Sequence, residues 1–179
     1  MIRIQRFCPR TSKLATNREP QPRLLVAKSV ARFIRESTAA SPDTETGGIL
    51  MGPPSPGPDV VVATHASGPG PAARREPDSF LRDTDHCRRV LRDHYERSRV
   101  DYVGEWHSHV VPLRRPSKGD LVTLVGIAMD PDYDFTAFGM IVALGGCSQQ
   151  EPPTPVELLG FVATRIGVFQ VPLEYVSEL

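Results

Sequence analysis

The sequence predicts one mixed α/β (α+β) domain in which helices pack against a central sheet. Its length of 179 residues suits a single domain. Its composition, 40% hydrophobic and 23% charged, is typical of a globular chain and excludes bulk disorder. Segments with a helical period also alternate along the chain with short apolar runs typical of strands. We divide the chain into an N-terminal strand or arm at 1–20 and a domain at 21–179.

The first half of the chain contains three predicted strands and one predicted helix. Residues 1–7 place apolar side chains at or near every second position, which indicates a weak first strand. Residues 24–37 place four apolar side chains on one face of a helix. Residues 47–52 and 59–66 are two short apolar runs around a proline cluster, which predicts strands joined by a hairpin loop.

The second half continues the alternation of helices and strands. Residues 78–97 carry one apolar helical stripe, with acidic side chains early and arginines late, as the helix dipole favours. Residues 101–109 are predicted as a strand, residues 120–129 as a helix and residues 135–146 as a buried strand. The apolar tail at 158–176 predicts one or two closing strands.

Charge and cysteine content limit the class of protein. The chain has 21 basic and 21 acidic residues, so its formal net charge is zero. This balance argues against nucleic acid or an anionic membrane as a partner. No apolar run approaches the roughly 20 residues of a membrane-spanning helix, and no secretory signal is visible. The three cysteines form no CxxC pair, so we expect no disulfide framework and a cytoplasmic location.

Residues 104–120, GEWHSHVVPLRRPSKGD, contain a set of potential metal ligands. Side chains two positions apart on a strand point to the same face, so His107 and His109 project together. The loop that follows can return Asp120 to complete a set of two nitrogens and one oxygen. Three protein ligands of these types, with water in the fourth position, are typical of catalytic zinc. The sequence therefore predicts one Zn²⁺ per chain.

Each part of this pattern also has a purely structural explanation. Two histidines on a strand can be ordinary surface or hydrogen-bonded side chains, and Ser117 with Asp120 matches a capping box at a helix start. A helix start can nevertheless present both side chains to a site. Amide hydrolysis further needs a base, and both Glu105, on the histidine strand, and Glu45, before a Gly-Gly pair, are candidates. Spacing alone does not choose between these glutamates.

The combined motif resembles that of a known enzyme family. ETGG at 45–48, GEWHSH at 104–109 and SKGD at 117–120 closely resemble the JAMM motif of the JAB/MPN metalloproteases. The resemblance spans about 45–146 and is greatest to the small prokaryotic JAB proteins of bacterial operons for ubiquitin-like conjugation, including antiviral CBASS operons. One departure is Val110, which stands where the family usually has proline.

The resemblance implies a fold and a role for each matching residue. The implied fold is the MPN, cytidine-deaminase-like arrangement of a curved mixed sheet flanked by helices. His107, His109 and Asp120 match the zinc ligands of the family. Glu45 matches the glutamate that shuttles the proton of the catalytic water, and Ser117 matches the serine that supports the oxyanion.

The resemblance also implies an activity. We expect a zinc-dependent isopeptidase that cleaves after the C-terminal glycine of a ubiquitin-like protein, in deconjugation or precursor maturation. E1- and E2-like enzymes of the same operon are candidate partners. Release of an amino acid from a small sulfur-carrier protein, or a non-catalytic MPN scaffold, are the alternatives. Arg114 and Arg115, in the loop between the ligands, are either solvated charges or contacts for an acidic part of the substrate.

Overall fold

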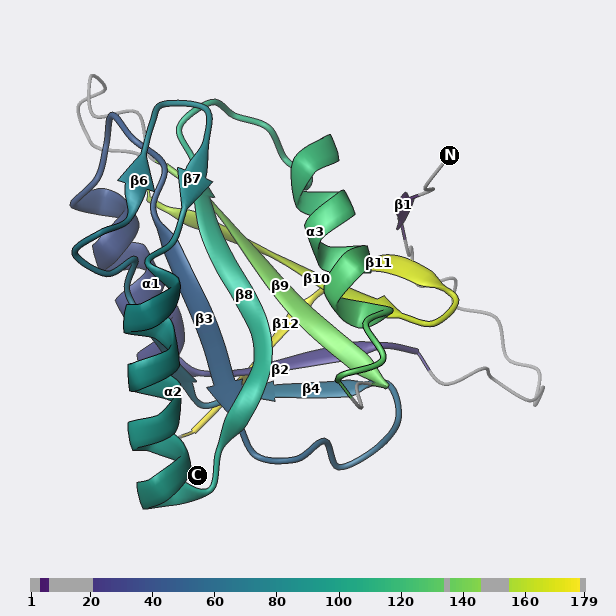
Figure 1. The fold of residues 1–179 in the computed structure, drawn as a ribbon. Helices are drawn as coiled ribbons and strands as arrows, with labels where there is room; N and C mark the ends of the chain where they lie inside the picture. Colours follow the sequence, from purple (N-terminus) through teal and green to yellow (C-terminus); the bar gives the residue numbers. More distant parts are fainter. Residues whose placement is uncertain (1–3, 7–20, 134–135, 146–154, 178–179) are drawn as a thin grey trace.

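The computed structural model describes residues 4–6, 21–133, 136–145 and 155–177 (Figure 1). In this part of the chain the largest sheet has seven strands in the order β1-β11-β10-β9-β8-β3-β5, and β8 and β9 are parallel within it. Its strands are β1 (Ile4–Arg6), β11 (Gly167–Val171), β10 (Glu157–Thr164), β9 (Ala137–Leu144), β8 (Asp101–His109), β3 (Gly47–Gly52) and β5 (His65–Ala66).

Two smaller sheets and three helices complete the described fold. A three-stranded sheet has the order β12 (Leu173–Val176), β2 (Arg23–Ala27) and β4 (Val60–Ala63), and β6 (Arg74–Arg75) pairs with β7 (Phe80–Leu81). The helices are α1 (Lys28–Ala39), α2 (Thr84–Ser98) and α3 (Lys118–Ala128). None of these helices is long and apolar enough to cross a membrane. The predicted mixed α/β class is confirmed.

The seven-stranded sheet lies between two apolar layers. On one face, α1 and the three-stranded sheet contribute Leu24 and Ile34, which pack with Trp106 of the central strand β8. On the other face, α2 and α3 contribute Cys87 and Leu124 (Figure 1). Because neighbouring residues of a strand point to opposite faces, the sheet separates two distinct cores.

A β-bulge in β8 changes which side chains share a face. Leu50 of β3 is opposite Gly104, but the next residue, Met51, is opposite Tyr102, so β8 has an extra residue at Val103. The extra residue puts Tyr102 on the same face as Glu105, although they are three positions apart. The Tyr102 hydroxyl donates a hydrogen bond to Glu105 Oε1 at 2.5 Å.

The helix predicted over 24–37 is wrong for its first residues. Residues 24–27 belong to β2, which lies between the parallel strands β12 and β4, and the helix begins at Lys28. Leu24 and Val26 are fully buried. The apolar run at 24–27 is continuous, and periodicity alone does not distinguish such a short run from the start of a helix.

The helix predicted over 78–97 also begins later than expected. Asp83 caps α2, because its Oδ1 accepts a hydrogen bond of 2.9 Å from the backbone N–H of His86. Phe80, which falls within the predicted helical range, lies in β7 instead. Cys87 lies in the core, as the helical stripe predicts.

The strands around 47–66 and 158–176 differ in number and pairing from the prediction. The segment 59–66 contains two strands: β4 joins the three-stranded sheet, and only β5 pairs with β3. The tail forms three strands. The predicted first strand is present as β1, parallel to β11. The other residues of 1–20, and Cys147, lie outside the described residues, and the division at residue 21 stays a prediction.

Substituting Gly48 tests the close approach of β3 to the chain after β5. A Cβ at Gly48 would lie 2.1 Å from the carbonyl oxygen of Ser67, so Gly48→Ala should destabilise the fold by about 1–3 kcal/mol. Gly126→Ala is the matched control, because a Cβ there meets nothing within 4 Å. In the helix α3 this control should stabilise by roughly 0.5–1 kcal/mol. Urea unfolding measures both, and equal midpoints would contradict the prediction.

Candidate metal centre

Strand β8 brings the two motif histidines together, as the sequence predicts. His107 lies opposite Gly47 on one side and Val142 on the other, so the strand is central in its sheet. The Nε2 atoms of His107 and His109 are 3.0 Å apart, and both side chains are buried. Paired neighbours on both sides therefore fix the backbone from which the two rings project.

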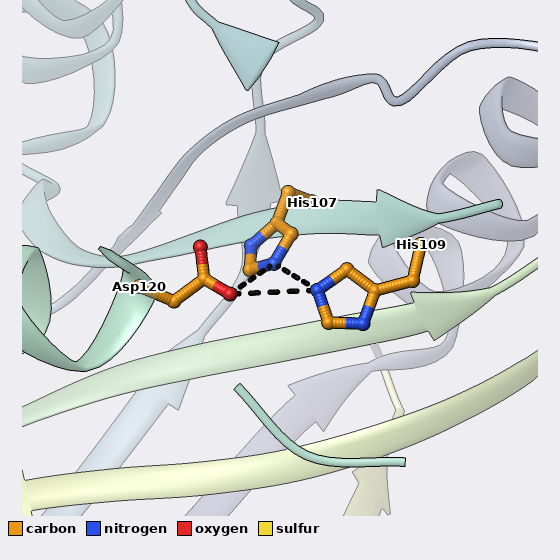
Figure 2. Close-up of side chains that lie close together, drawn as sticks. All are labelled: His107, His109 and Asp120. Carbon is orange, nitrogen blue, oxygen red and sulfur yellow. Dashed lines mark hydrogen bonds and ion pairs between the residues drawn. The ribbon is translucent and has the colours of Figure 1, made fainter. Parts of the chain in front are cut away.

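The start of α3 supplies the third side chain. Ser117 and Asp120 form a capping box: Asp120 Oδ2 accepts from the Ser117 backbone N–H at 2.6 Å, and Ser117 Oγ accepts from the Asp120 backbone N–H at 3.2 Å. The same Oδ2 atom lies 3.2 Å from His107 Nε2 and 3.4 Å from His109 Nε2 (Figure 2). The helix cap and the ligand position are thus two roles of one carboxylate.

The distances between these three atoms fit a tetrahedral metal. Zinc bonds of roughly 2.0–2.1 Å place two ligands of a tetrahedron about 3.3 Å apart, and the observed separations are 3.0, 3.2 and 3.4 Å. Among the residues that the structure describes, His107, His109 and Asp120 are the one group of three that converges in this way. Two imidazoles and a carboxylate are also a donor set that zinc accepts.

A backbone carbonyl selects the metal-binding form of His109. Its Nδ1 lies 2.9 Å from the carbonyl oxygen of Leu113. A carbonyl only accepts, so Nδ1 carries a proton, and Nε2, which faces Asp120, would offer its lone pair to a metal once it gives up its own proton. Burial acts to raise the pKa of Asp120, but hydrogen bonds with His107 and His109 outweigh it and hold that pKa well below its usual range. The third ligand is therefore an ionised carboxylate.

Glu45 lines the same cavity, two residues before β3. Thr46 anchors this part of the chain to β8: its N–H donates to Ser108 Oγ at 2.9 Å, and its carbonyl accepts from the Ser108 N–H at 2.7 Å. A Cβ at Gly47 would lie 2.4 Å from the Trp106 carbonyl oxygen, so glycine permits this approach. Burial raises the pKa of Glu45, although His107 and His109 act to lower it. A carboxylate with a raised pKa is suited to accept a proton.

The alternative base, Glu105, is already engaged. Its Oε1 forms an ion pair with Arg82 and accepts the hydrogen bond from Tyr102. The side chain is only 10% exposed, and a buried carboxylate requires such partners. The geometry therefore favours Glu45 as the group available for proton transfer. Sequence reasoning missed Arg82 and Tyr102, because the bulge and the pairing between segments leave no local pattern.

The candidate ligands and both candidate bases line one cavity of about 610 Å³. Its walls include Glu45, both histidines, Ser117 and Asp120, together with side chains from β7 and from the loop after β8. Arg114 and Arg115 are not among its lining residues. Arg114 instead makes a bidentate ion pair with Glu157, with N···O distances of 2.5 and 2.6 Å. A substrate-binding role for these two arginines stays a prediction.

Comparisons with known proteins agree with this geometry. The family model described as prokaryotic homologs of the JAB domain matches residues 27–158. A solved solution structure of a protein from Desulfitobacterium hafniense matches with a TM-score of 0.62 and 17% sequence identity, covering 87% of this chain and 94% of that chain. At this identity the likeness shows a shared fold. No curated protein matches the sequence significantly.

Proposed function

Because the chain belongs to the family of prokaryotic homologs of the JAB domain, we propose that it is a zinc-dependent peptidase that cleaves after the C-terminal glycine of a ubiquitin-like protein. The family membership confirms the resemblance seen in the motif. The observation that carries the proposal is the convergence of His107, His109 and Asp120 beside Glu45 in one cavity. Metal-assisted amide hydrolysis requires metal ligands and a nearby general base, and these four side chains can supply both.

In the proposed reaction, Glu45 transfers the proton and Ser117 stabilises the oxyanion. Held by His107, His109 and Asp120, a zinc ion would act as a Lewis acid that polarises the scissile carbonyl and makes water a stronger nucleophile. Glu45 accepts the proton of the attacking water and returns it to the leaving amine. Ser117 Oγ accepts the cap hydrogen bond from Asp120, which leaves its own O–H to donate to the developing oxyanion.

The shape of the cavity wall supports an extended tail as the substrate. Phe80 and Leu81 of β7 line the cavity, and β7 pairs with β6 alone among the described strands. An extended peptide can add beside such an edge strand through main-chain hydrogen bonds. Small residues next to the scissile bond suit this arrangement, because a large side chain would separate the two backbones. A flexible C-terminal tail ending in glycine has this character.

Cleavage of a panel of fusions tests the proposal. Ubiquitin-like proteins with a C-terminal extension, or joined to a lysine, are incubated with the purified protein with and without a zinc chelator. We expect cleavage after glycine in at least one fusion, loss of cleavage with chelator and recovery with added zinc. Mass spectrometry of the products identifies the bond that is cut.

Other results in the same panel would identify the alternative functions. Exclusive release of one amino acid from a sulfur-carrier protein would replace ubiquitin-like conjugates by that substrate. Purified protein without stoichiometric zinc and without cleavage would support a non-catalytic scaffold. E1- and E2-like partners, a role in antiviral defence and a cytoplasmic location belong to the same proposal, and the genes adjacent to this one test them most directly.

A further inference from the structure

A partly buried ion pair connects one wall of the cavity, the segment 76–82, to its floor, the strand β8. Arg82 lies between β7 and the cap of α2, and its Nη1 pairs with Oε1 of Glu105 on β8. The side chains are 28% and 10% exposed, and both line the cavity. Tyr102 donates to the same oxygen at 2.5 Å. The pair therefore connects the segment 76–82 to the strand that carries the histidines.

The same wall segment contacts the chain at Glu45. The backbone N–H of Glu45 donates to the carbonyl of Glu76 at 2.8 Å. A Cβ at Gly47 would lie 2.7 Å from Phe80 Cε1, so the Phe80 ring lies directly against Gly47. The position of the wall and the position of the Glu45 backbone are therefore coupled.

The segment 76–82 has little secondary structure of its own to fix its position against β8. β6 and β7 contain two residues each, and an isolated two-stranded hairpin is marginally stable. Besides its contacts with Glu45 and Gly47, two hydrogen bonds flank the segment: Arg75 Nη1 donates to Ser41 Oγ at 3.3 Å, and the Asp83 N–H donates to the Pro69 carbonyl at 2.9 Å. Arg82 is the charged tie that reaches the floor strand.

We propose that Arg82 is a positioning residue for Glu45, acting by holding the segment 76–82 against β8. This inference rests on the proposed function for its kinetic consequence. Without the Arg82–Glu105 ion pair, the segment 76–82 is held less firmly against β8. The Glu76 carbonyl, which accepts the hydrogen bond from the Glu45 N–H, then no longer fixes the Glu45 backbone. Catalytic groups displaced by about 1 Å can lose up to ~10² in rate. The metal ligands are held by β8 and by the α3 cap, so zinc should stay bound.

The test compares Arg82→Ala, Arg82→Lys and the wild-type protein on the best fusion of the panel. Arg82→Ala should lower kcat about tenfold or more with little change in KM, and Arg82→Lys should restore most of the loss. Zinc content should stay near one per chain. Hydrogen exchange at the Glu45 amide, which Glu76 protects, should become faster in Arg82→Ala. The control is Arg88→Ala, which removes an exposed α2 pair with Asp85 and should change none of these quantities.

Unchanged kcat together with unchanged exchange in Arg82→Ala would overturn the inference. If Arg82→Ala fails to fold, Glu105→Gln replaces it, because the neutral amide removes the ion pair and leaves the more exposed Arg82, not the more buried Glu105, without its partner charge. The double variant Arg82→Ala/Glu105→Gln should be no slower than the slower single variant, since both remove one interaction. If the losses of turnover in the two single variants add in the double variant, Arg82 and Glu105 act independently, and the inference is wrong. If the wild-type protein cleaves no fusion, the proposed function fails, and the exchange measurement still decides the inference.

Discussion

Replacing Glu45 by alanine should lower peptidase turnover at least ~10²-fold while zinc binding and the fold are retained. Glu45 is the carboxylate beside the three ligand atoms that has no role in holding them: the Asp120 oxygen and the two histidine nitrogens lie 3.0 to 3.4 Å from one another without it. Its removal therefore takes away a proton acceptor and leaves the metal ligands in place. Steady-state kinetics on the cleaved fusion, with zinc analysis of the same preparation, measures both effects.

The matched control is Glu45→Gln, which keeps the size of the side chain and removes its ability to accept a proton. A loss similar to that of the alanine variant would assign the effect to proton transfer, whereas near-normal turnover in both variants would give the base role to Glu105. Loss of zinc in either variant would show that Glu45 acts as a ligand. The Glu45 N–H donates a hydrogen bond to the Glu76 carbonyl. Thermal unfolding of each variant should therefore be measured beside the kinetics, to verify that the substitution leaves the fold intact.

The core of the site could be predicted from the sequence because it depends on local geometry. The period of a strand brings His107 and His109 to one face, and β8 pairs with β9 in unbroken register across both residues. The capping pattern of Ser117 and Asp120 marks a helix start from four consecutive residues. Only the family resemblance favoured Glu45 over Glu105 as the base, because 55 residues (46–100) lie between Glu45 and the histidine strand, and no local pattern relates the two.

The remaining features depend on contacts between distant segments. Parity along β8 fails at Val103, so the sequence does not show that Tyr102 meets Glu105. The pairing of Arg82 with Glu105 requires β7 to lie beside the cavity, and two-residue strands have no detectable period. Residues 24–27 form a strand because they pair with β12 and β4. These tertiary contacts outweigh the helical pattern of the local sequence.

Replacing Asp120 by alanine should abolish both zinc binding and activity, because it removes one of three protein ligands. The substitution also removes the acceptor for the Ser117 N–H at the start of α3, a loss of about 1 kcal/mol for a helix cap. Zinc that binds only the folded chain stabilises it by mass action. Adding a chelator should therefore lower the thermal midpoint of the wild-type protein and leave that of Asp120→Ala unchanged.

Asp120→Asn separates the two roles of this carboxylate. Asparagine can still accept the Ser117 N–H and cap α3, but its neutral amide is a poor zinc ligand. We expect the asparagine variant to retain the stability of the chelated wild-type protein while losing zinc and turnover, whereas the alanine variant should be less stable by the cap contribution. Elemental analysis decides the question: one zinc per chain in Asp120→Ala would show that the metal is held by other residues, and the assignment of His107, His109 and Asp120 as the ligand set would be wrong.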